Sequence, residues 1–327
     1  MNKRLNVSVI QMPLGEPLEN LAYLKTSVER LMKSYVKPEL VIGVEYGISN
    51  RPLSIPGPVT TFLGSIARTY GIYFIPGTMA ESSGELPDGQ YYNTCPVFGP
   101  DGRLLAAYRK KIPFCPGEAA VPSKNPEVCI FEIPEKDIKV GVLICYEQFF
   151  PEIPRALAME GAELMICPAL DPLEYRHIPD ILPRARALEN EVFYIWTCGS
   201  GTGAKGTLCG SSVIVDPEGE VVYKCGQEPC QITLTLDLEQ VKRKRFAGRD
   251  QHLNSLRAFT LPKSYAGNLE AAPVYHGMLK LTRTPKEYAE RLKELGLAPI
   301  QKTVKSEQED AATQLEIQFQ DLANVLQ

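Results

Sequence analysis

The chain has 327 residues, of which 44% are hydrophobic and 23% charged, and its formal net charge is -4. These values are ordinary for a globular protein and argue against disorder over most of the chain, and the length suits one large α/β core with an appendage. No apolar run approaches the roughly 18 residues of a bilayer span, so we expect a soluble protein without a signal peptide or a membrane partner. The negative charge gives no general attraction to nucleic acid, so we expect no nucleic-acid partner.

The nine cysteines are an odd number and lie mostly inside apolar runs, which favours a reducing, cytoplasmic location over a disulfide framework. Only Cys225 and Cys230 are close together, and the three histidines are scattered, so we expect no metal and no cofactor. The basic run at 242–249 is best interpreted as a solvated helix face.

The first third of the chain alternates strand and helix patterns. Residues 5–13 alternate apolar and polar positions, whereas the leucines and valine between 18 and 31 recur at helical spacing. The same order follows with a strand at 39–44, a helix at 60–71 and a strand at 72–78. Strands that alternate with helices predict parallel pairing through right-handed crossovers.

The rest of the core adds two hairpins to this alternation. Residues 91–110 predict a hairpin that turns at 100–102, and residues 211–225 predict a second that turns at 216–219. Between them we expect strands at 138–145, 163–169 and 191–198 with helices at 151–162 and 177–190, followed by a strand at 231–238. Strands this apolar need cover on both faces, so the sequence predicts a four-layer α-β-β-α sandwich of two mixed sheets.

After about residue 270 the strand patterns cease. We expect residues 1–270 to form the α/β domain and residues 271–327 to form a C-terminal helical extension, with helices at 284–296 and 309–326. The second helix carries one apolar face, so it is expected to dock on something; the residues of this face are Leu315, Phe319, Leu322 and Leu326.

Three reactive side chains fall at predicted strand ends, where open α/β sheets collect their chemistry. These are Glu45 after 39–44, Lys110 at the end of the first hairpin and Cys145 after 138–144. A thiol with a pKa near ~8.5 needs a base or cation to become a nucleophile, and Glu45 could take its proton. Taken singly, Cys145 is better explained as a core thiol, and Glu45 and Lys110 can each be explained as a surface charge at a strand end.

Together the three residues suit acyl transfer. Sulfur that attacks an amide carbonyl creates an oxyanion, which Lys110 and the backbone N–H of Tyr146 could stabilise. Glu45 could then protonate the leaving amine and activate water against the thioester.

Three segments resemble the catalytic blocks of the nitrilase (carbon–nitrogen hydrolase) superfamily: "VEYGIS", "YRKKIPFCPGE" and "GVLICYEQFFPE". The resemblance covers roughly residues 5 to 260 and implies the α-β-β-α fold, Glu45 as general base, Lys110 as the oxyanion lysine and Cys145 as nucleophile. It favours Lys110 over Lys111, because the family lysine directly follows a Tyr-Arg pair.

The segment "RKKIPFCPGE" most resembles the aliphatic amidase and formamidase branch, which implies that Glu118 is a second catalytic or structural glutamate. On this resemblance Glu118 lies beside the acyl pocket and accepts a hydrogen bond from the amide. Two positions depart from the family pattern, because Val44 replaces a proline and Glu147 replaces an aspartate.

The pocket is expected to include Phe114, Phe149 and Phe150, which follow the lysine and the nucleophile. These rings would favour short acyl chains. The segment "GTGAKG" at 201–206 matches a dinucleotide fingerprint, but it leads into a strand and is better interpreted as a glycine-rich loop.

The sequence therefore predicts a hydrolase that cleaves a small, linear amide through an acyl-cysteine and releases ammonia or an amine. A nitrilase would use the same residues and is the competing enzymatic hypothesis. Two non-enzymatic hypotheses stand beside it: an inactive scaffold of the same fold that recruits partners through its C-terminal helices, and a nucleic-acid binder that uses 242–249. Family members commonly assemble through helices, so a homo-oligomer is expected.

Overall fold

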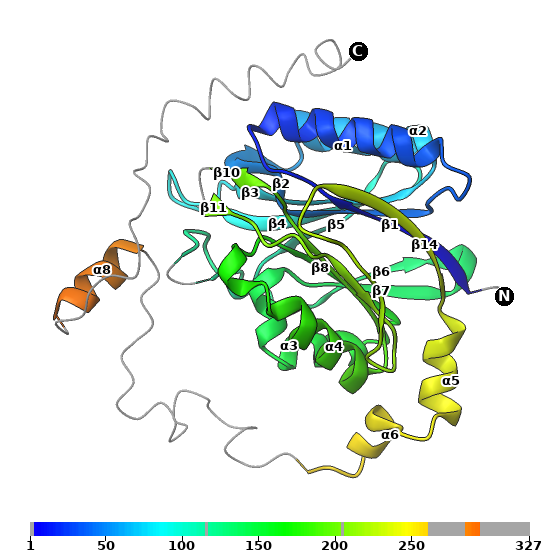
Figure 1. The fold of residues 1–327 in the computed structure, drawn as a ribbon. Helices are drawn as coiled ribbons and strands as arrows, with labels where there is room; N and C mark the ends of the chain where they lie inside the picture. The colour runs from blue at the N-terminus through cyan, green and yellow to red at the C-terminus, as the bar shows by residue number, and fades with distance from the viewer. Residues whose placement is uncertain (1–2, 115–116, 204–205, 261–284, 295–327) are drawn as a thin grey trace.

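The computed structural model of the chain describes residues 3–114, 117–203, 206–260 and 285–294. Two six-stranded sheets face each other, with helices α1 and α2 on the outer face of one and α3 and α4 on the outer face of the other (Figure 1). The predicted four-layer α-β-β-α sandwich of two mixed sheets is therefore confirmed.

The first sheet has the strand order β14-β1-β2-β3-β4-β5. Its centre is parallel, since β2 pairs in parallel with both β1 and β3, while the remaining neighbours are antiparallel. The bounds are Arg4–Gln11 (β1), Leu40–Ser54 (β2), Tyr73–Ser82 (β3), Tyr92–Phe98 (β4), Leu104–Arg109 (β5), Cys230–Asp237 (β14), Pro17–Met32 (α1) and Pro58–Tyr70 (α2).

The second sheet has the order β13-β12-β9-β8-β7-β6 and is parallel across β7, β8 and β9. The bounds are Cys129–Ile133 (β6), Ile138–Val142 (β7), Leu164–Ala169 (β8), Phe193–Cys198 (β9), Val213–Val215 (β12), Val221–Lys224 (β13), Glu152–Met159 (α3) and Ile178–Asn190 (α4).

The main hydrophobic core lies between the two sheets and is built from the inward-facing residues of both. The central strands β8 and β9 are buried along their whole length, which is the reason that their sequences are almost entirely apolar. A charged side chain, Lys110, is among the largest fully buried side chains of this region. A buried ammonium needs paired carboxylates, so its position marks a polar cluster inside the core.

Three elements differ from the sequence prediction. Strand β2 continues to Ser54, beyond the end predicted at 44, so Glu45 lies within the strand and not at its end. Strand β6 is missing from the prediction, because only every second residue of its five faces the core and the segment follows a long polar loop. The glycine-rich loop at 201–206 carries a two-residue ladder between Thr202–Gly203 (β10) and Gly206–Thr207 (β11). Strands β6, β10 and β11 are all short, and two to five residues give too few repeats for a periodic pattern to be detected.

The basic run at 242–249 is helical over most of its length, in α5 (Glu239–Ala247), but it is not the wholly solvated face that we expected. Lys244 is 4% exposed and its Nζ lies 2.5 Å from Glu218. Arg245 donates to the backbone carbonyl oxygens of Ala162 and Asn190. These two cations therefore attach α5 to the second sheet and its helices.

The C-terminal extension is described only in part. Helix α6 (His252–Leu256) ends the described part of the α/β domain, and α8 (Pro285–Glu294) falls within the helix predicted at 284–296. The helix predicted at 309–326 lies outside the described residues. No helix among the described residues is long and apolar enough to cross a membrane.

Candidate active site

The three side chains singled out from the sequence meet at one point between the sheets. Glu45 lies in β2, Lys110 directly follows β5 and Cys145 follows β7. Lys110 Nζ donates to Glu45 Oε1 at 2.8 Å, and the negative charge of the same carboxylate acts on the Cys145 thiol. All three are at least nine-tenths buried.

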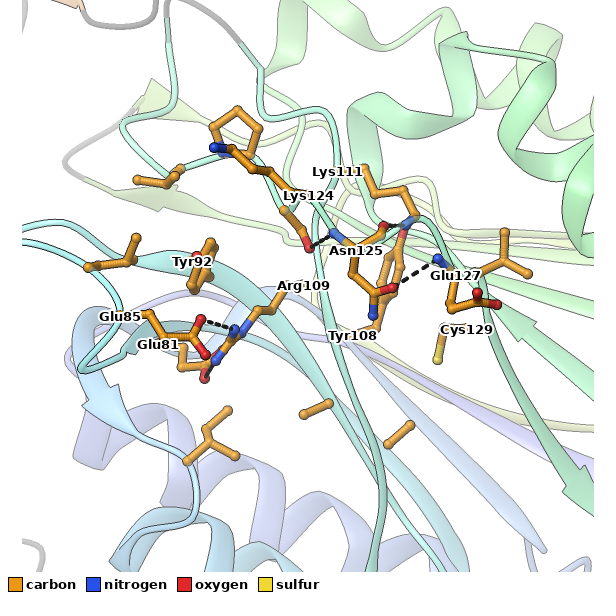
Figure 2. Close-up of a pocket in the computed structure, with 18 of the residues that line it drawn as sticks. Glu81, Glu85, Tyr92, Tyr108, Arg109, Lys111, Lys124, Asn125, Glu127 and Cys129 are labelled. Carbon is orange, nitrogen blue, oxygen red and sulfur yellow. Dashed lines mark hydrogen bonds and ion pairs between the residues drawn. The ribbon is translucent and has the colours of Figure 1, made fainter.

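Strand alternation explains why Lys110 and not its neighbours reaches this cluster. Arg109 and Lys111 face a second, larger cavity of about 870 Å³, where Arg109 pairs with Glu81 and the Lys111 ammonium donates to the Asn125 carbonyl (Figure 2). Successive side chains in a strand point to opposite faces, so the middle residue of the three points inward. Arg109 also pairs with Glu85 at this larger cavity, and Cys145 is not among the residues that line it.

Glu118 lies on the other side of the Lys110 ammonium. Its Oε2 accepts from Lys110 Nζ at 2.7 Å and from the Phe114 N–H at 2.8 Å. Its Oε1 accepts from the Tyr46 hydroxyl and from Asn93 Nδ2, both at 2.7 Å. Each oxygen of Glu118 therefore already has two donors, and little capacity is left for a substrate N–H.

Lys110 keeps one donor for a ligand. An ammonium has three N–H groups, and two of them reach Glu45 and Glu118. Asn93 Nδ2 bridges the same two carboxylates, 2.8 Å from Glu45 Oε1. Because both of these donors bind Oε1 of Glu45, its Oε2 is the oxygen left for the thiol or a substrate.

The backbone that presents Glu45 is held in an unusual conformation. Tyr46 has a φ of 53°, and its N–H donates to Thr78 Oγ1 at 2.8 Å. Strand β3 approaches so closely here that a Cβ on Gly77 would lie 1.9 Å from the Val44 carbonyl oxygen. Only glycine permits this contact, which fixes the bend that turns Glu45 into the interior.

The nucleophile opens a short 3-10 helix, Cys145–Phe149 (η2), and Cys145 itself has a φ of 46°. Such a conformation costs on the order of 1–3 kcal/mol for a residue with a side chain, and it persists only where the surroundings impose it. The first hydrogen bond of η2 runs from the Glu147 N–H to the Ile144 carbonyl. The N–H of Tyr146 precedes this bond and so has no acceptor within η2, which leaves it available for an oxyanion.

Glu147 supplies the constraint on this turn. Its Oε2 accepts from the Ile144 N–H at 2.7 Å, and its Oε1 accepts from the Lys111 N–H at 2.6 Å and the Tyr108 hydroxyl at 2.9 Å. Glu147 is completely buried and is not among the residues that line the cavity beside Cys145. Glu147, which replaces the family aspartate, therefore affects the hydrogen bonds that hold the backbone beside Cys145 and Lys110, and it does not affect the cavity wall.

The two glutamates around Lys110 have pKa values displaced in opposite directions. Burial and the neighbouring Glu118 charge raise the pKa of Glu45 above its usual range, although Lys110 opposes the shift. Burial also disfavours the charge on Glu118, but the Lys110 charge and four hydrogen bonds outweigh it and lower its pKa. Glu118 thus favours its charged form, while Glu45 is the carboxylate better suited to accept and return a proton.

Cys145 rests as a thiol. Burial and the negative charges of Asp171 and Glu45 raise the pKa of Cys145 well above its usual range, against the attraction of Lys110. The Lys110 ammonium stays charged, because its two carboxylates more than offset the burial that opposes its charge and raise its pKa. Attack by Cys145 therefore requires a base at the moment of reaction.

The sequence analysis missed Asp171, which follows β8 next to the nucleophile strand. Its Oδ1 accepts from Cys145 Sγ at 3.6 Å, and burial raises its pKa to about 7, with a further contribution from Glu45. The sequence pattern could have indicated Asp171, because it is a polar residue that follows a third parallel strand. Tyr46 and Asn93 were missed as well, and only their polarity inside apolar strands could have indicated them.

The cluster opens into a cavity of about 350 Å³. Of the three rings expected around the nucleophile, Phe114 and Phe149 line this cavity, whereas Phe150 is not among the described lining residues and packs against the Tyr146 ring. The opposite wall includes Leu170, Tyr175 and Leu208. This volume suits a small molecule, and the few polar groups gather at the thiol.

An α-β-β-α sandwich with Cys145, Lys110 and Glu45 gathered between its two sheets fits the class of carbon–nitrogen hydrolases. The chain belongs to the carbon–nitrogen hydrolase family, whose model matches residues 6–246.

Curated relatives agree with this assignment. Omega-amidase NIT2-B of Xenopus laevis is 35% identical over 208 residues, which cover 58% of this chain and 71% of the relative. Omega-amidase NIT2 of Homo sapiens is 34% identical over 202 residues, with 58% of this chain and 71% of the relative covered. The predicted membership of the nitrilase superfamily is confirmed, while the aliphatic amidase and formamidase branch stays a prediction.

Solved structures show the same fold. Nit3 of Saccharomyces cerevisiae, a member of branch 10 of the nitrilase superfamily, superposes with a TM-score of 0.67 at 26% identity and covers 78% of this chain and 97% of its own. A mutant of the amidase from Nesterenkonia sp. AN1 in complex with butyramide has a TM-score of 0.62 at 23% identity, with 74% and 94% covered.

Proposed function

We propose that the chain hydrolyses the C–N bond of a small linear amide through a thioester on Cys145 and releases ammonia. The observation that carries the proposal is the hydrogen-bonded cluster in which Lys110 binds Glu45 and Glu118 and keeps one N–H beside the Cys145 thiol. The relatives named as amidases and omega-amidases support the amide as substrate.

Acylation follows from the positions of these groups. Glu45 Oε2 takes the thiol proton as sulfur bonds the carbonyl carbon, and the carbonyl electron pair moves to oxygen. The Lys110 ammonium and the Tyr146 N–H stabilise this oxyanion. When the oxyanion collapses, the C–N bond breaks, and the proton held by Glu45 passes to the nitrogen, which leaves as ammonia.

Deacylation repeats these steps with water in place of the thiol. Glu45, again ionised, takes a proton from water, whose oxygen bonds the thioester carbon. The second tetrahedral intermediate expels sulfur, which recovers its proton from Glu45 as the carboxylic acid is released. The raised pKa of Glu45 suits both halves, because a base that must return its proton works best near the ambient pH.

Amides are favoured over nitriles because a carboxylate oxygen beside the Cys145 thiol can accept a hydrogen bond from the substrate. The oxygens of Glu118 are already occupied, so the donor of the amide –NH2 group is assigned to Glu45 Oε2 instead of Glu118. A nitrile offers no N–H donor, and the loss of one hydrogen bond to a charged group costs about 1.5–3 kcal/mol, or roughly a 10- to 150-fold loss in rate.

Initial rates of ammonia release on short-chain amides and the corresponding nitriles test the proposal. We expect amides to be hydrolysed faster, and the folded Cys145→Ala variant to be inactive. Cys167→Ala, which removes a fully buried thiol outside the cavity lining, serves as the matched control and should retain activity. Faster turnover of nitriles would assign the chain to the nitrilases instead, and activity in folded Cys145→Ala would exclude the thioester route.

A further inference from the structure

The cavity contains a carboxylate that the proposed chemistry does not use. Asp171 lines the cavity and is 8% exposed. Its Oδ1 contacts the thiol of Cys145, but its Oδ2 is buried and has no hydrogen-bond partner among the described residues. A buried carboxylate oxygen without a donor is costly, which indicates that a ligand supplies the donor.

The position of Asp171 assigns it to the acyl side of the substrate. The reacting carbon carries three groups: the nitrogen is assigned to Glu45, and the oxygen to Lys110 and the Tyr146 N–H. Both charged groups come from the first sheet, whereas Asp171 follows β8 of the second sheet and contacts the sulfur directly. Since sulfur bonds the acyl carbon, an acyl substituent one or two carbons away lies within reach of Oδ2.

The charge of the cavity selects what this substituent can be. The described lining residues include three carboxylates, Glu45, Glu118 and Asp171, and the single cation is Lys110, which already binds two of them. No arginine or histidine lies among those lining residues. An acyl chain that ends in a carboxylate would meet uncompensated negative charge, whereas an ammonium group would pair with Asp171.

We propose that Asp171 determines specificity, and that the cavity takes amides whose acyl chain carries a protonated amine at the α or β carbon. This inference rests on the proposed amide hydrolysis and names its substrate class. The amine forms a charge-assisted hydrogen bond with Oδ2 while the thiol attacks the carbonyl carbon.

Three amides of nearly equal size test the inference, because they differ mainly in charge: 3-aminopropionamide, butyramide and succinamate. We expect kcat/KM to be highest for the cationic amide and lowest for the anionic one. The cationic amide should exceed butyramide by about tenfold or more, as one charge-assisted hydrogen bond provides. In Asp171→Asn this ratio should fall toward one, since the amide side chain keeps the shape and loses the charge.

Asp180→Asn is the matched control. Asp180 has a 58% exposed side chain, pairs with Lys224 and does not line the cavity, so the same change of charge there should leave the ratio at its wild-type value. A ratio that Asp171→Asn leaves unchanged, or a wild-type preference for butyramide or succinamate, would overturn the inference.

The pH dependence of the ratio separates selection from a structural role. Glu45, Lys110 and Cys145 face Asp171, and their titration affects all three amides alike, so it cancels in the ratio. The wild-type ratio should fall as the pH drops through about 7, the pKa of Asp171, while that of Asp171→Asn stays flat.

Binding to the inactive Cys145→Ala variant distinguishes failure of selection from failure of the chemistry. We expect 3-aminopropionamide to raise the melting temperature of this variant and not that of Cys145→Ala combined with Asp171→Asn. Binding without ammonia release by the wild type would contradict the proposed hydrolysis and leave the selection supported. Absence of binding would overturn the proposed selection by Asp171. Complete loss of turnover in Asp171→Asn, with activity retained in Glu45→Gln, would also overturn it, because Asp171 would then be the base.

Discussion

Lys110 sets the charge state of the residues around it. It is 1% exposed and holds two carboxylates within 2.8 Å, so removal of either carboxylate changes the environment of the other. The structure thereby separates two chemically identical glutamates: the pKa of Glu118, which has four donors, is lowered, and that of Glu45, beside the thiol, is raised. This separation suits the roles that we propose for Glu45 as base and for Lys110 as oxyanion donor.

Glu118→Gln tests the coupling between the two glutamates. The negative charge of Glu118 raises the pKa of Glu45, so its removal should lower that pKa and move the acid limb of kcat/KM to lower pH. The plateau should fall by about 100-fold, because Lys110 loses one of its two anchors. Glu85→Gln, a 71% exposed carboxylate paired with Arg109, is the control and should leave the profile unchanged. A limb that stays in place or moves to higher pH would contradict the assigned roles.

Asp171 should also reduce stability. Its pKa rises from 3.8 to about 7 on folding, so the folded chain binds more protons than the unfolded chain between these values. Stability from this group is present below pH ~4 and is lost as the pH rises to about 7, a change on the order of 4 kcal/mol. Asp171→Asn should therefore be more stable than wild type near pH 8 and about equal near pH 4 in urea unfolding. An equal change in the free energy of unfolding at both pH values would contradict a raised pKa of the buried Asp171 carboxyl.

At the level of elements, the η2 turn and the segment after β5 are joined through one buried side chain. Glu147 accepts from the backbone of both segments, at Ile144 and Lys111. The positive φ of Cys145 and the inward direction of Lys110 therefore share a single support. A residue that never touches the cavity can in this way set the distance between nucleophile and oxyanion donor.

Glu147→Gln should disturb both segments. A glutamine has one acceptor oxygen for three donors, so at least one buried N–H loses its partner, at a cost of about 1–3 kcal/mol in the free energy of unfolding. Tyr108→Phe removes one donor and leaves both backbone bonds, so it should cost about 1 kcal/mol and retain most activity. Urea unfolding and kcat of the two variants provide the comparison. Equal losses in both would show that Glu147 does not hold the turn.

The elements show what periodicity can and cannot predict. Strands β8 and β9 are continuous apolar runs between helices, so their type and direction follow from the sequence. Strand ends also placed Glu45, Lys110 and Cys145 in one region, although the family resemblance was needed to assign their roles. The number of donors around Glu118 and the packing of Phe150 against Tyr146 depend on contacts between segments far apart in sequence. Such contacts leave no local pattern.

At the scale of the whole molecule, the site exists only while the two sheets face each other. The first sheet provides Glu45 and Lys110, and the second provides Cys145 and Asp171. Activity should therefore disappear together with the packing between the sheets, and a variant that unfolds only the C-terminal extension should keep the chemistry.

The C-terminal extension is where we propose that copies of the chain associate. The residues at 309–326 lie outside the described part of the structure, and the proposal rests on their apolar face in the sequence. Truncation after Ser306 should lower the mass of the assembly measured by light scattering. Retention of the full mass would remove the extension from the interface.

The covalent intermediate tests the central claim most directly. Wild-type protein mixed with a small amide, quenched in acid within one turnover and measured by intact-mass spectrometry should gain the mass of the acyl group, and peptide mapping should place it on Cys145. Cys167→Ala should show the same adduct and Cys145→Ala none. An adduct on another residue, or ammonia release by folded Cys145→Ala, would contradict hydrolysis through a Cys145 thioester.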